Sequence, residues 1–429
     1  MLTHVNSSED RVVETAQPGP RVGFRLPLET PVASLAVAVA ALLLGFDMLA
    51  GPLRYYLAQA GLESLVYLPK GCCFIFILYE LTRRQVDRLL LWVLLLLFFY
   101  AGVGLLHQVS PKMQFFSLFL VVPALFGVAA GRHLPGRERG VVRLLAAVFA
   151  VTALGVYLDF FCDFPWDGFS YKVEGAEVEG SREWSSFGLS RRAGFTRMSA
   201  AAAFYLVCCG LFLFSYLKSW RLKLTVALCA FPAVLLTTNK AGIVGFLLGL
   251  GSLAVARLPV WRRLYLYGLA VAVMAFPFST LVRSYDMSLA DPVSLLLLAS
   301  FEDRLINTWP SFLAAVAKLG SPLTGIGFGG VGSAVKYFSG PGSDMLAFAD
   351  NFALYLYGCF GVAAAALFLY LARVTDRLFA SPRALSRALA PAMVALLAAS
   401  LTTDVVESQV FALLLGLAVA SARDAVETL

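Results

Sequence analysis

Long apolar runs separated by short polar segments dominate the hydropathy pattern of this chain. About twelve such runs are long enough for a helix to cross a membrane, and they lie near residues 31–50, 61–80, 88–107, 113–131, 141–161, 196–217, 221–238, 241–257, 264–282, 349–372, 385–402 and 407–422. A helix needs roughly 17–25 apolar residues to cross the hydrocarbon core. The pattern therefore predicts an all-α, polytopic integral membrane protein with about twelve transmembrane helices.

The composition agrees with this prediction. Of the 429 residues, 59% are hydrophobic and only 14% are charged, and the mean hydropathy is +0.78. A soluble protein with so few charges could not cover its surface with polar groups. The apolar runs are also too long and continuous for the alternating strands of a membrane barrel.

The spacing of the runs divides the chain into six parts. We expect a cytoplasmic tail at 1–30, five spans in 31–161, an outer loop at 162–195, four spans in 196–282, a large outer loop at 283–348, and three spans in 349–429. In the large loop, the apolar periodicity of 292–319 predicts two short helices along the membrane surface, broken at Pro310.

The orientation follows from the basic residues. Most of the 34 lysines and arginines lie in the tail and in the short loops on one side of the predicted spans. Cytoplasmic loops carry such an excess, so both termini are predicted to be cytoplasmic and both long loops to face outward. The net charge of +7 is spread among these loops, and no basic, aromatic-interleaved tract indicates nucleic-acid binding.

Arginines at the outer ends of spans are the strongest candidates for chemistry. Arg192 precedes the sixth span, Arg283 follows the ninth, and Arg304 lies within the large loop. One interpretation is that they reach lipid headgroups. The other is a cradle for a diphosphate, because guanidinium groups form paired hydrogen bonds with phosphate oxygens. Arg191 and Lys240 are placed to join such a cradle.

Asp350 and Asn351 open the predicted tenth span. Aspartate is a good N-cap, so Asp350 has a structural interpretation. The alternative is that its carboxylate orients or deprotonates a sugar hydroxyl. Asp404 and Glu407 lie on the same side, where capping and solvating a hairpin is the simpler interpretation.

The glycine patterns indicate structure more than chemistry. The run from Gly325 to Gly330 lacks the preceding strand and the Lys-Ser/Thr ending of phosphate-binding loops, so we expect a tight loop there. Gly242, Gly245 and Gly249 have the spacing of close helix packing. Neither the three histidines nor the seven cysteines have the spacing of a metal site, and no cofactor is expected.

Several of these residues together resemble the O-antigen ligase and polymerase (Wzy-type) family of integral-membrane glycosyltransferases. The resemblance covers roughly residues 185–375 and rests on Arg192-Ala193-Gly194-Phe195, Thr238-Asn239-Lys240-Ala241, Arg304, Trp309, Ser321-Pro322 with Gly325, Gly327 and Gly329, and Gly358 with Gly361. Lys240 stands where the family pattern has arginine. The order and the common outward placement of these motifs make the combination more specific than each motif alone.

The resemblance implies a metal-independent enzyme of the broad GT-C type in a bacterial inner membrane, with a periplasmic active site. Its substrate would be a glycan linked to undecaprenyl diphosphate, and a chain-length regulator and a flippase would be candidate partners. By analogy, Arg192 and Arg304 would hold the diphosphate and Arg283 would assist. Trp309 and Asn351 would contribute to substrate binding.

One departure from the ligase pattern bears on the reaction. Ligases carry a histidine near the asparagine that opens this span, whereas this chain has Asp350. The resemblance therefore favours polymerisation of repeat units, with ligation to lipid A-core or protein as the alternative. A transporter or flippase for a lipid-linked sugar is a third hypothesis. It would need polar groups along the bilayer midplane, and the predicted spans hold very few. Lys70, at the start of a span interior, is the main exception.

Overall fold

The computed structural model describes residues 29–83, 86–134, 136–173, 176–182, 185–186, 189–285, 292–338 and 344–427. The protein is mostly helical, and the strands form two small antiparallel hairpins, β1 (Ser170–Val173) with β2 (Ala176–Glu179) and β3 (Ser185–Ser186) with β4 (Leu189–Ser190). Both hairpins lie in the first predicted outer loop, where the sequence had indicated no strands.

The helices follow the apolar pattern closely. In the first two thirds of the chain they are α1 (Glu29–Met48), α2 (Ala50–Gln59), η1 (Glu63–Tyr67), α3 (Leu68–Thr82), α4 (Arg88–Leu106), α5 (Pro111–Gly131), α6 (Glu138–Phe161), α7 (Ser199–Tyr216), α8 (Trp220–Leu236), α9 (Lys240–Val255) and α10 (Pro259–Ser279). Each of the first nine predicted spans falls on one of these helices. The sequence pattern did not predict α2 as a separate element.

The last third of the chain contains shorter helices. They are α11 (Pro292–Asp303), the π-helical segment η2 (Arg304–Thr308), α12 (Trp309–Leu319), α13 (Ser333–Phe338), η3 (Asp344–Leu346), α14 (Phe352–Phe360), α15 (Ala363–Ala380), α16 (Ala384–Ala399), η4 (Val405–Glu407) and α17 (Gln409–Glu427). The two predicted loop helices are present as α11 and α12. The irregularity between them starts at Arg304, before Pro310, which lies in the first turn of α12.

The described helices support a membrane protein. Six segments are long and apolar enough to cross a bilayer: 31–48, 63–82, 88–106, 111–131, 138–161 and 199–216. Further apolar helices, including α9 and α16, are shorter than this criterion requires. The number of twelve crossings therefore remains a prediction.

The predicted tenth span is divided into two helices. Between α14 and α15 the chain turns at Gly361, whose φ is +57°, a conformation that residues with a side chain rarely adopt. A Cβ atom at this position would also clash with the backbone carbonyl of Leu323. The sequence did not predict this break between two helices, because a run of apolar residues extends across 349–372 and hydropathy carries no information on backbone conformation.

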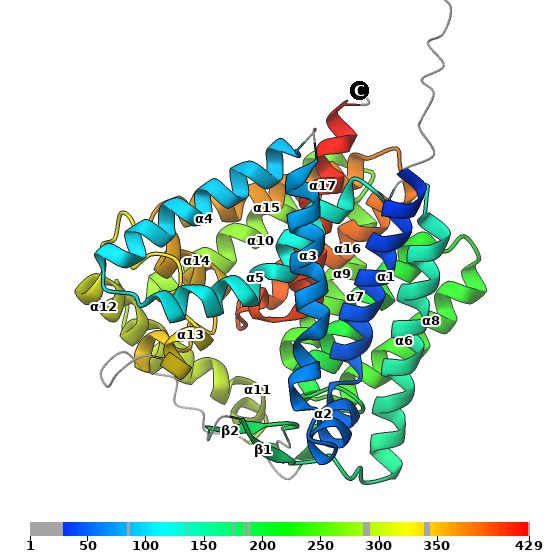
Figure 1. Ribbon diagram of the computed structural model, residues 1–429, viewed down its shortest axis with the longest axis horizontal. Helices are drawn as coiled ribbons and strands as arrows, with labels where there is room; N and C mark the ends of the chain where they lie inside the picture. The colour runs from blue at the N-terminus through cyan, green and yellow to red at the C-terminus, as the bar shows by residue number, and fades with distance from the viewer. Residues whose placement is uncertain are drawn as a thin grey trace, which may run out of the picture.

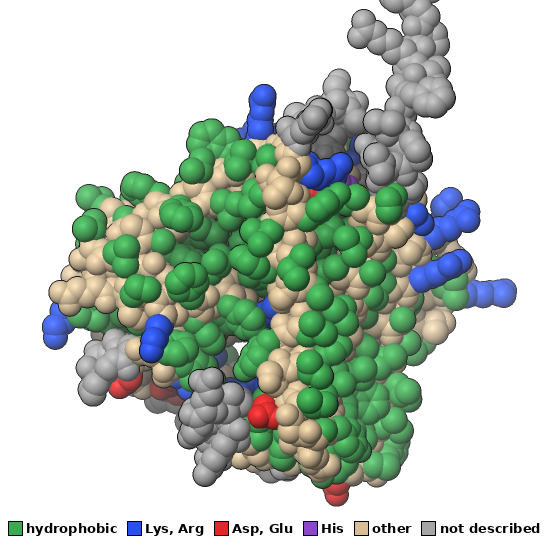
Figure 2. Space-filling model, in the orientation of Figure 1, with side chains coloured by type: hydrophobic (Ala, Val, Ile, Leu, Met, Phe, Trp, Pro, Cys, Tyr) green, Lys and Arg blue, Asp and Glu red, His purple; other side chains and the backbone are tan. Residues whose placement is uncertain are grey.

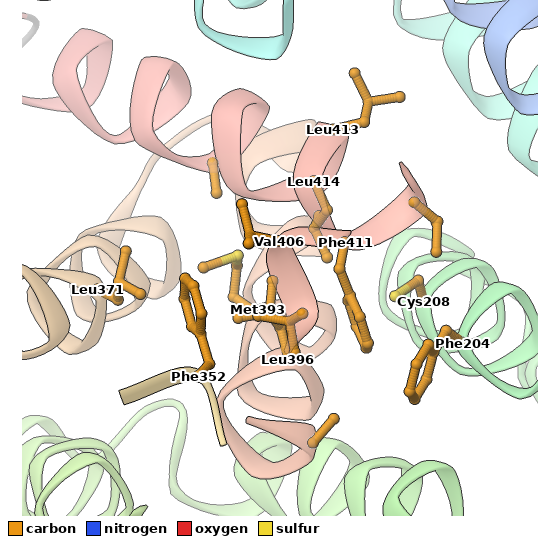
Figure 3. Close-up of a cluster of buried hydrophobic side chains, with 14 of the residues drawn as sticks. Phe204, Cys208, Phe352, Leu371, Met393, Leu396, Val406, Phe411, Leu413 and Leu414 are labelled. Atoms are coloured by element: carbon orange, nitrogen blue, oxygen red, sulfur yellow. The ribbon is translucent and has the colours of Figure 1, made fainter. Parts of the chain in front are cut away.

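Helix α16 is the centre of the hydrophobic core. Every residue from Ala388 to Ala399 is buried, so this helix is apolar on all sides and enclosed by its neighbours. Figure 3 shows Met393 and Leu396 of α16 between Phe352 on α14 and Phe411 on α17. The residues flanking α16 at both ends therefore have fixed positions.

Glycines allow the helices around α16 to approach closely. A Cβ on Gly245 would lie 3.1 Å from the carbonyl oxygen of Ala395, and one on Gly249 would lie 3.0 Å from that of Pro391. These contacts confirm that Gly245 and Gly249 are packing positions. A second close crossing joins α5 to α17, where a Cβ on Gly127 would lie 2.6 Å from the carbonyl oxygen of Leu413.

Several long helices, among them α1, α3 and α6, run between two ends of the molecule (Figure 1). The start of α1 and the end of α17 lie at one end, whereas α2, the β1–β2 hairpin and α11 lie at the other. Elements from both predicted outer loops therefore occupy the same end. We call it the loop end, and it contains the polar residues considered below.

The α5–α17 crossing gives a test of this packing. Gly416→Ala places a methyl group against the backbone carbonyl of Ala124, so we expect a loss of about 1–3 kcal/mol, the usual cost of overpacking. Gly268→Ala in α10 is the matched control, because no atom lies within 4 Å of its added Cβ. The melting temperature of the detergent-purified protein should fall for Gly416→Ala alone. Equal melting temperatures for the two variants would contradict the close crossing.

Candidate functional site

The central contact of the loop end is an ion pair between Arg304 and Asp350. The Nη2 atom of Arg304 lies 3.0 Å from Oδ2 of Asp350. Arg304 also donates from Nη1 to the carbonyl oxygen of Ser300 at 2.7 Å and from Nη2 to that of Thr402 at 3.4 Å. These contacts tie the large loop to the segments that open α14 and follow α16. The Nε of Arg304 is buried and has no hydrogen-bond partner among the described residues.

Asn351 fixes the position of Asp350. It is fully buried, and its Oδ1 accepts a hydrogen bond from the backbone N–H of Leu354, which makes Asn351 the N-cap of α14. Its Nδ2 donates to the carbonyl oxygens of Val273 and Leu401, both at 3.2 Å. The capping interpretation of Asp350 is therefore wrong, since its neighbour occupies that position. Both ends of the Asn351 side-chain amide are thus engaged in hydrogen bonds that hold the fold together.

Asp350 is held in an unusual backbone conformation. Its φ is +48°, which is rare for a residue with a side chain and carries strain that neighbouring contacts must offset. The backbone N–H groups of Asp350 and Asn351 donate to the carboxylate of Asp404, at 3.4 and 3.2 Å. This arrangement leaves the side chain of Asp350 directed at Arg304.

Asp404 and Glu407 bind other segments instead of solvating a hairpin. Burial raises the pKa of Asp404 well above its ordinary value, and the nearby charges of Glu407 and Asp350 add to the shift. Glu407 accepts hydrogen bonds from the backbone N–H and the hydroxyl of Ser333, at 2.8 and 2.5 Å. The interpretation of these two residues as a solvated hairpin cap is wrong.

A tight turn places Lys240 at the start of α9. Thr238 has a φ of +51°, and Asn239 caps the helix by accepting from the backbone N–H of Gly242 at 2.7 Å. Thr237 is fully buried and donates its hydroxyl to the carbonyl oxygen of Val234. Lys240 is therefore the first residue of a helix N-terminus, where the helix dipole favours negative charge.

Arg191, Lys240 and Arg304 form a group of positive charges from three separate segments. The charges of Arg191 and Arg304 both act on the ammonium of Lys240. We call these three residues the first cationic group. The space-filling view shows a hollow at this end of the molecule with lysine or arginine side chains inside it (Figure 2). Mutual repulsion makes such a group unfavourable in isolation, so it suits an anionic ligand.

Arg192 does not make the same contacts as Arg191. Its Nη1 lies 3.1 Å from Oδ1 of Asp159, a carboxylate in α6 that is only 4% exposed. The other oxygen of Asp159 accepts from the backbone N–H of Gly194 at 2.7 Å. The backbone N–H of Arg192 itself donates to the carbonyl oxygen of Leu236 at 3.3 Å. Arg192 thus braces the loop that carries Arg191.

Two other sequence candidates lie apart from the first cationic group. Arg283 is exposed and lies over the ring of Tyr285, with 5.4 Å from its guanidinium carbon to the ring centroid. No contact among the described residues joins it to Arg304. Trp309 is fully buried, and its ring packs edge-on against Phe301. The structure therefore gives Trp309 a packing position next to the π-helical segment that carries Arg304.

The glycine run holds the large loop against the transmembrane helices. The N–H of Ile326 donates to the carbonyl oxygen of Gly358, and that of Phe328 donates to Tyr100, at 2.7 and 2.8 Å. Gly327 has a φ of +99° and lies directly against the backbone of Gly104 in α4. These contacts hold the segment against α4 and α14, which agrees with the expectation of a tight loop.

The sequence did not lead us to predict the ion pair of Asp159 with Arg192. It also did not predict that Asp404 binds the backbone of Asp350 and Asn351. A lone carboxylate at the end of a predicted apolar span was an available signal for Asp159, since a buried charge requires a partner. No sequence pattern indicates the contacts of Asp404 with the backbone, because they join residues more than 50 positions apart. Among the described residues, no three His, Cys, Asp or Glu side chains are grouped so that they could hold a metal ion.

The ion pair of Arg192 with Asp159 gives a prediction that distinguishes a structural role of Arg192 from a catalytic role. Arg192→Gln leaves a buried carboxylate without its cation and should lower the melting temperature and the activity together. Adding Asp159→Asn removes that charge, so the double variant should recover much of the melting temperature. Thermal unfolding of the purified protein measures this. A stable but inactive Arg192→Gln would instead assign Arg192 to the reaction.

Comparison with known proteins identifies no relative for this chain. A scan against protein-family models and a search of curated proteins both find no match. What the site can do chemically follows from the first cationic group and the Asp350 carboxylate beside it.

Proposed function

We propose that the protein is a polysaccharide polymerase, for O-antigen or exopolysaccharide, in a bacterial inner membrane. It would transfer a growing glycan from undecaprenyl diphosphate to the sugar of an incoming lipid-linked repeat unit. The observation that carries the proposal is the first cationic group, Arg191, Lys240 and Arg304, with the Asp350 carboxylate paired to Arg304. This combination offers an anion site and a proton acceptor side by side.

The cations would act on the leaving diphosphate. In the transfer, the acceptor hydroxyl oxygen forms a bond to the anomeric carbon while the bond from that carbon to the diphosphate oxygen breaks. Negative charge then grows on the diphosphate, and preorganised cations stabilise it more than they stabilise the bound substrate. Arg304 is suited to this task because the carbonyl oxygens of Ser300 and Thr402 hold its Nη1 and Nη2, while its Nε has no partner among the described residues.

Asp350 would accept the proton of the attacking hydroxyl. Its carboxylate is directed by the strained backbone and by the N–H bonds to Asp404, so its position is set before substrate binds. In the free enzyme this carboxylate is paired with Arg304. When the diphosphate binds Arg304, the carboxylate is partly released and becomes available to the hydroxyl.

A ligase that attaches the glycan to lipid A-core or protein is the second candidate. The absence of a histidine beside Asn351 favours the polymerase, because Asp350 occupies that place. His107 contacts the backbone carbonyl oxygen of Ile326 through Nδ1 at 3.1 Å. A transporter fits less well, because the cations gather at one end and not along a central path. A chain-length regulator and a flippase remain candidate partners.

Arg304→Ala is the direct test of this proposal. It removes one donor from the developing charge, and losses of roughly 10²–10³-fold in rate are typical of such changes. We expect long-chain polysaccharide to disappear while the protein still inserts in the membrane. Gel profiles of the glycan, with immunoblots of the membrane fraction, measure both quantities. Arg304→Lys should recover little, because lysine lacks the planar fork.

Arg283→Ala is the matched control, since this arginine is exposed and lies outside the first cationic group. Its glycan profile should match that of the wild type. Normal chain length in Arg304→Ala would overturn the proposal. In the deletion strain, accumulation of single-unit glycan indicates a polymerase, whereas long chains that are not attached to their acceptor indicate a ligase.

A further inference from the structure

A second group of positive charges lies at the same end of the molecule. It consists of Arg54 in α2, Lys70 in α3 and Arg197 just before α7, and we call it the second cationic group. Arg54 donates to the hydroxyl of Tyr171 at 2.9 Å, and Arg197 donates from Nε to the carbonyl oxygen of Glu179 at 3.1 Å. Lys70 lies over the ring of Phe119, with Nζ 4.1 Å from the centroid. None of the three forms an ion pair with a described carboxylate.

Lys70 and Arg54 line a small cavity with Asp47 and Gln409. Lys70 is only 9% exposed, so its ammonium has lost most of its contact with solvent. The nearest carboxylate of the cavity, Asp47, is already bound by the Tyr205 hydroxyl and the Gln409 amide, both at 2.8 Å. The cavity therefore contains a buried cation whose charge is not matched by a contact ion pair among the described residues.

Arg54 links the three cations electrostatically, because its charge acts on both Lys70 and Arg197. The charges of Arg54 and Arg197 both act on Asp47, as does that of Lys70, and Arg54 also acts on Arg197. Bringing such charges together in a poorly solvated place is costly unless an anion binds there. Three cations of this kind suit a group with more than one negative charge.

Carboxylates separate the two cationic groups. The charge of Glu407 acts on Lys70 on one side and on Asp404 on the other, and Asp404 in turn binds the backbone at Asp350. Asp350 then pairs with Arg304 of the first cationic group. These contacts thus link the second cationic group, through acidic residues, to the first cationic group.

We propose that the second cationic group binds the diphosphate headgroup of a second lipid-linked glycan. This inference rests on the proposed function, in which each of two substrates carries its own diphosphate. The position of the group supports a headgroup over a distant sugar, because Lys70 lies in the first turn of α3 and Asp47 in the last turn of α1. The ends of a membrane-crossing helix lie near the lipid headgroups.

The two sites would hold the substrates in different chemical roles. The diphosphate in the first cationic group is the leaving group, so its cations stabilise charge that grows during the reaction. The diphosphate in the second cationic group keeps its bond to the sugar, and its cations only position the acceptor.

Binding of farnesyl diphosphate, a short soluble prenyl diphosphate, tests this inference directly. Titration calorimetry of the full chain in phosphatidylcholine nanodiscs should give two equivalents bound. Arg54→Gln and Lys70→Gln should each weaken one equivalent by tenfold or more and leave the other unchanged. Arg304→Gln should do the reverse. Lys112→Gln, an exposed lysine in the first turn of α5, is the matched control and should keep both.

The outcomes separate this inference from the proposed function. One equivalent that is lost in Arg304→Gln and unchanged in Arg54→Gln and Lys70→Gln would overturn the second site alone. One equivalent that is lost in Arg54→Gln and kept in Arg304→Gln would support the second site and overturn the first as a diphosphate site. No binding to the wild type would overturn both. Arg54 is half-buried at the cavity, so its variant serves if Lys70→Gln does not fold.

The source of the phosphate is tested in the same assay. Nanodiscs that contain phosphatidylglycerol offer an ordinary anionic headgroup in large excess. Retention of two equivalents of farnesyl diphosphate in these nanodiscs supports a site for the lipid-linked substrate. Loss of the equivalent that depends on Arg54 and Lys70, with the other retained, would overturn that assignment in favour of bulk membrane lipid.

Discussion

The ion pair between Arg304 and Asp350 is the contact on which the loop end depends. It joins the large loop to the start of α14, and the same arginine reaches the carbonyl oxygen of Thr402 after α16. This ion pair is the direct link between Asp350, whose backbone is strained, and the π-helical segment that carries Arg304. The strain is offset by Asn351, which is fully buried and bonded on both sides of its amide.

The buried core explains why this contact can be held in place. Helix α16 is enclosed on all sides, so the segments at its ends, including Thr402 and Asp404, cannot shift freely. Gly245 and Gly249 bring α9 close to α16, and α9 in turn presents Lys240 at its first turn. The position of the first cationic group is thus a consequence of helix packing that a few small residues permit.

Much of this arrangement follows from the sequence, and the remainder has identifiable physical reasons. Apolar length predicted the long helices, and outward placement selected Arg304 and Lys240 as candidates. The sequence could indicate that Asp159 needs a partner, but not that the partner is Arg192, because the ion pair joins α6 to a loop through a long-range contact. Likewise, hydropathy could not distinguish Asn351 from Asp350 as the cap, nor detect the turn at Gly361. Which side chains converge is decided by packing that periodicity does not record.

The central claim is that Arg191, Lys240 and Arg304 bind one diphosphate beside the Asp350 carboxylate. An experimental structure of the protein in lipid nanodiscs with undecaprenyl diphosphate tests it most directly. The account predicts phosphate density within hydrogen-bond distance of Arg304 and of at least one of Arg191 and Lys240. Density for the diphosphate only at the exposed Arg283, or at neither cationic group, would contradict the account.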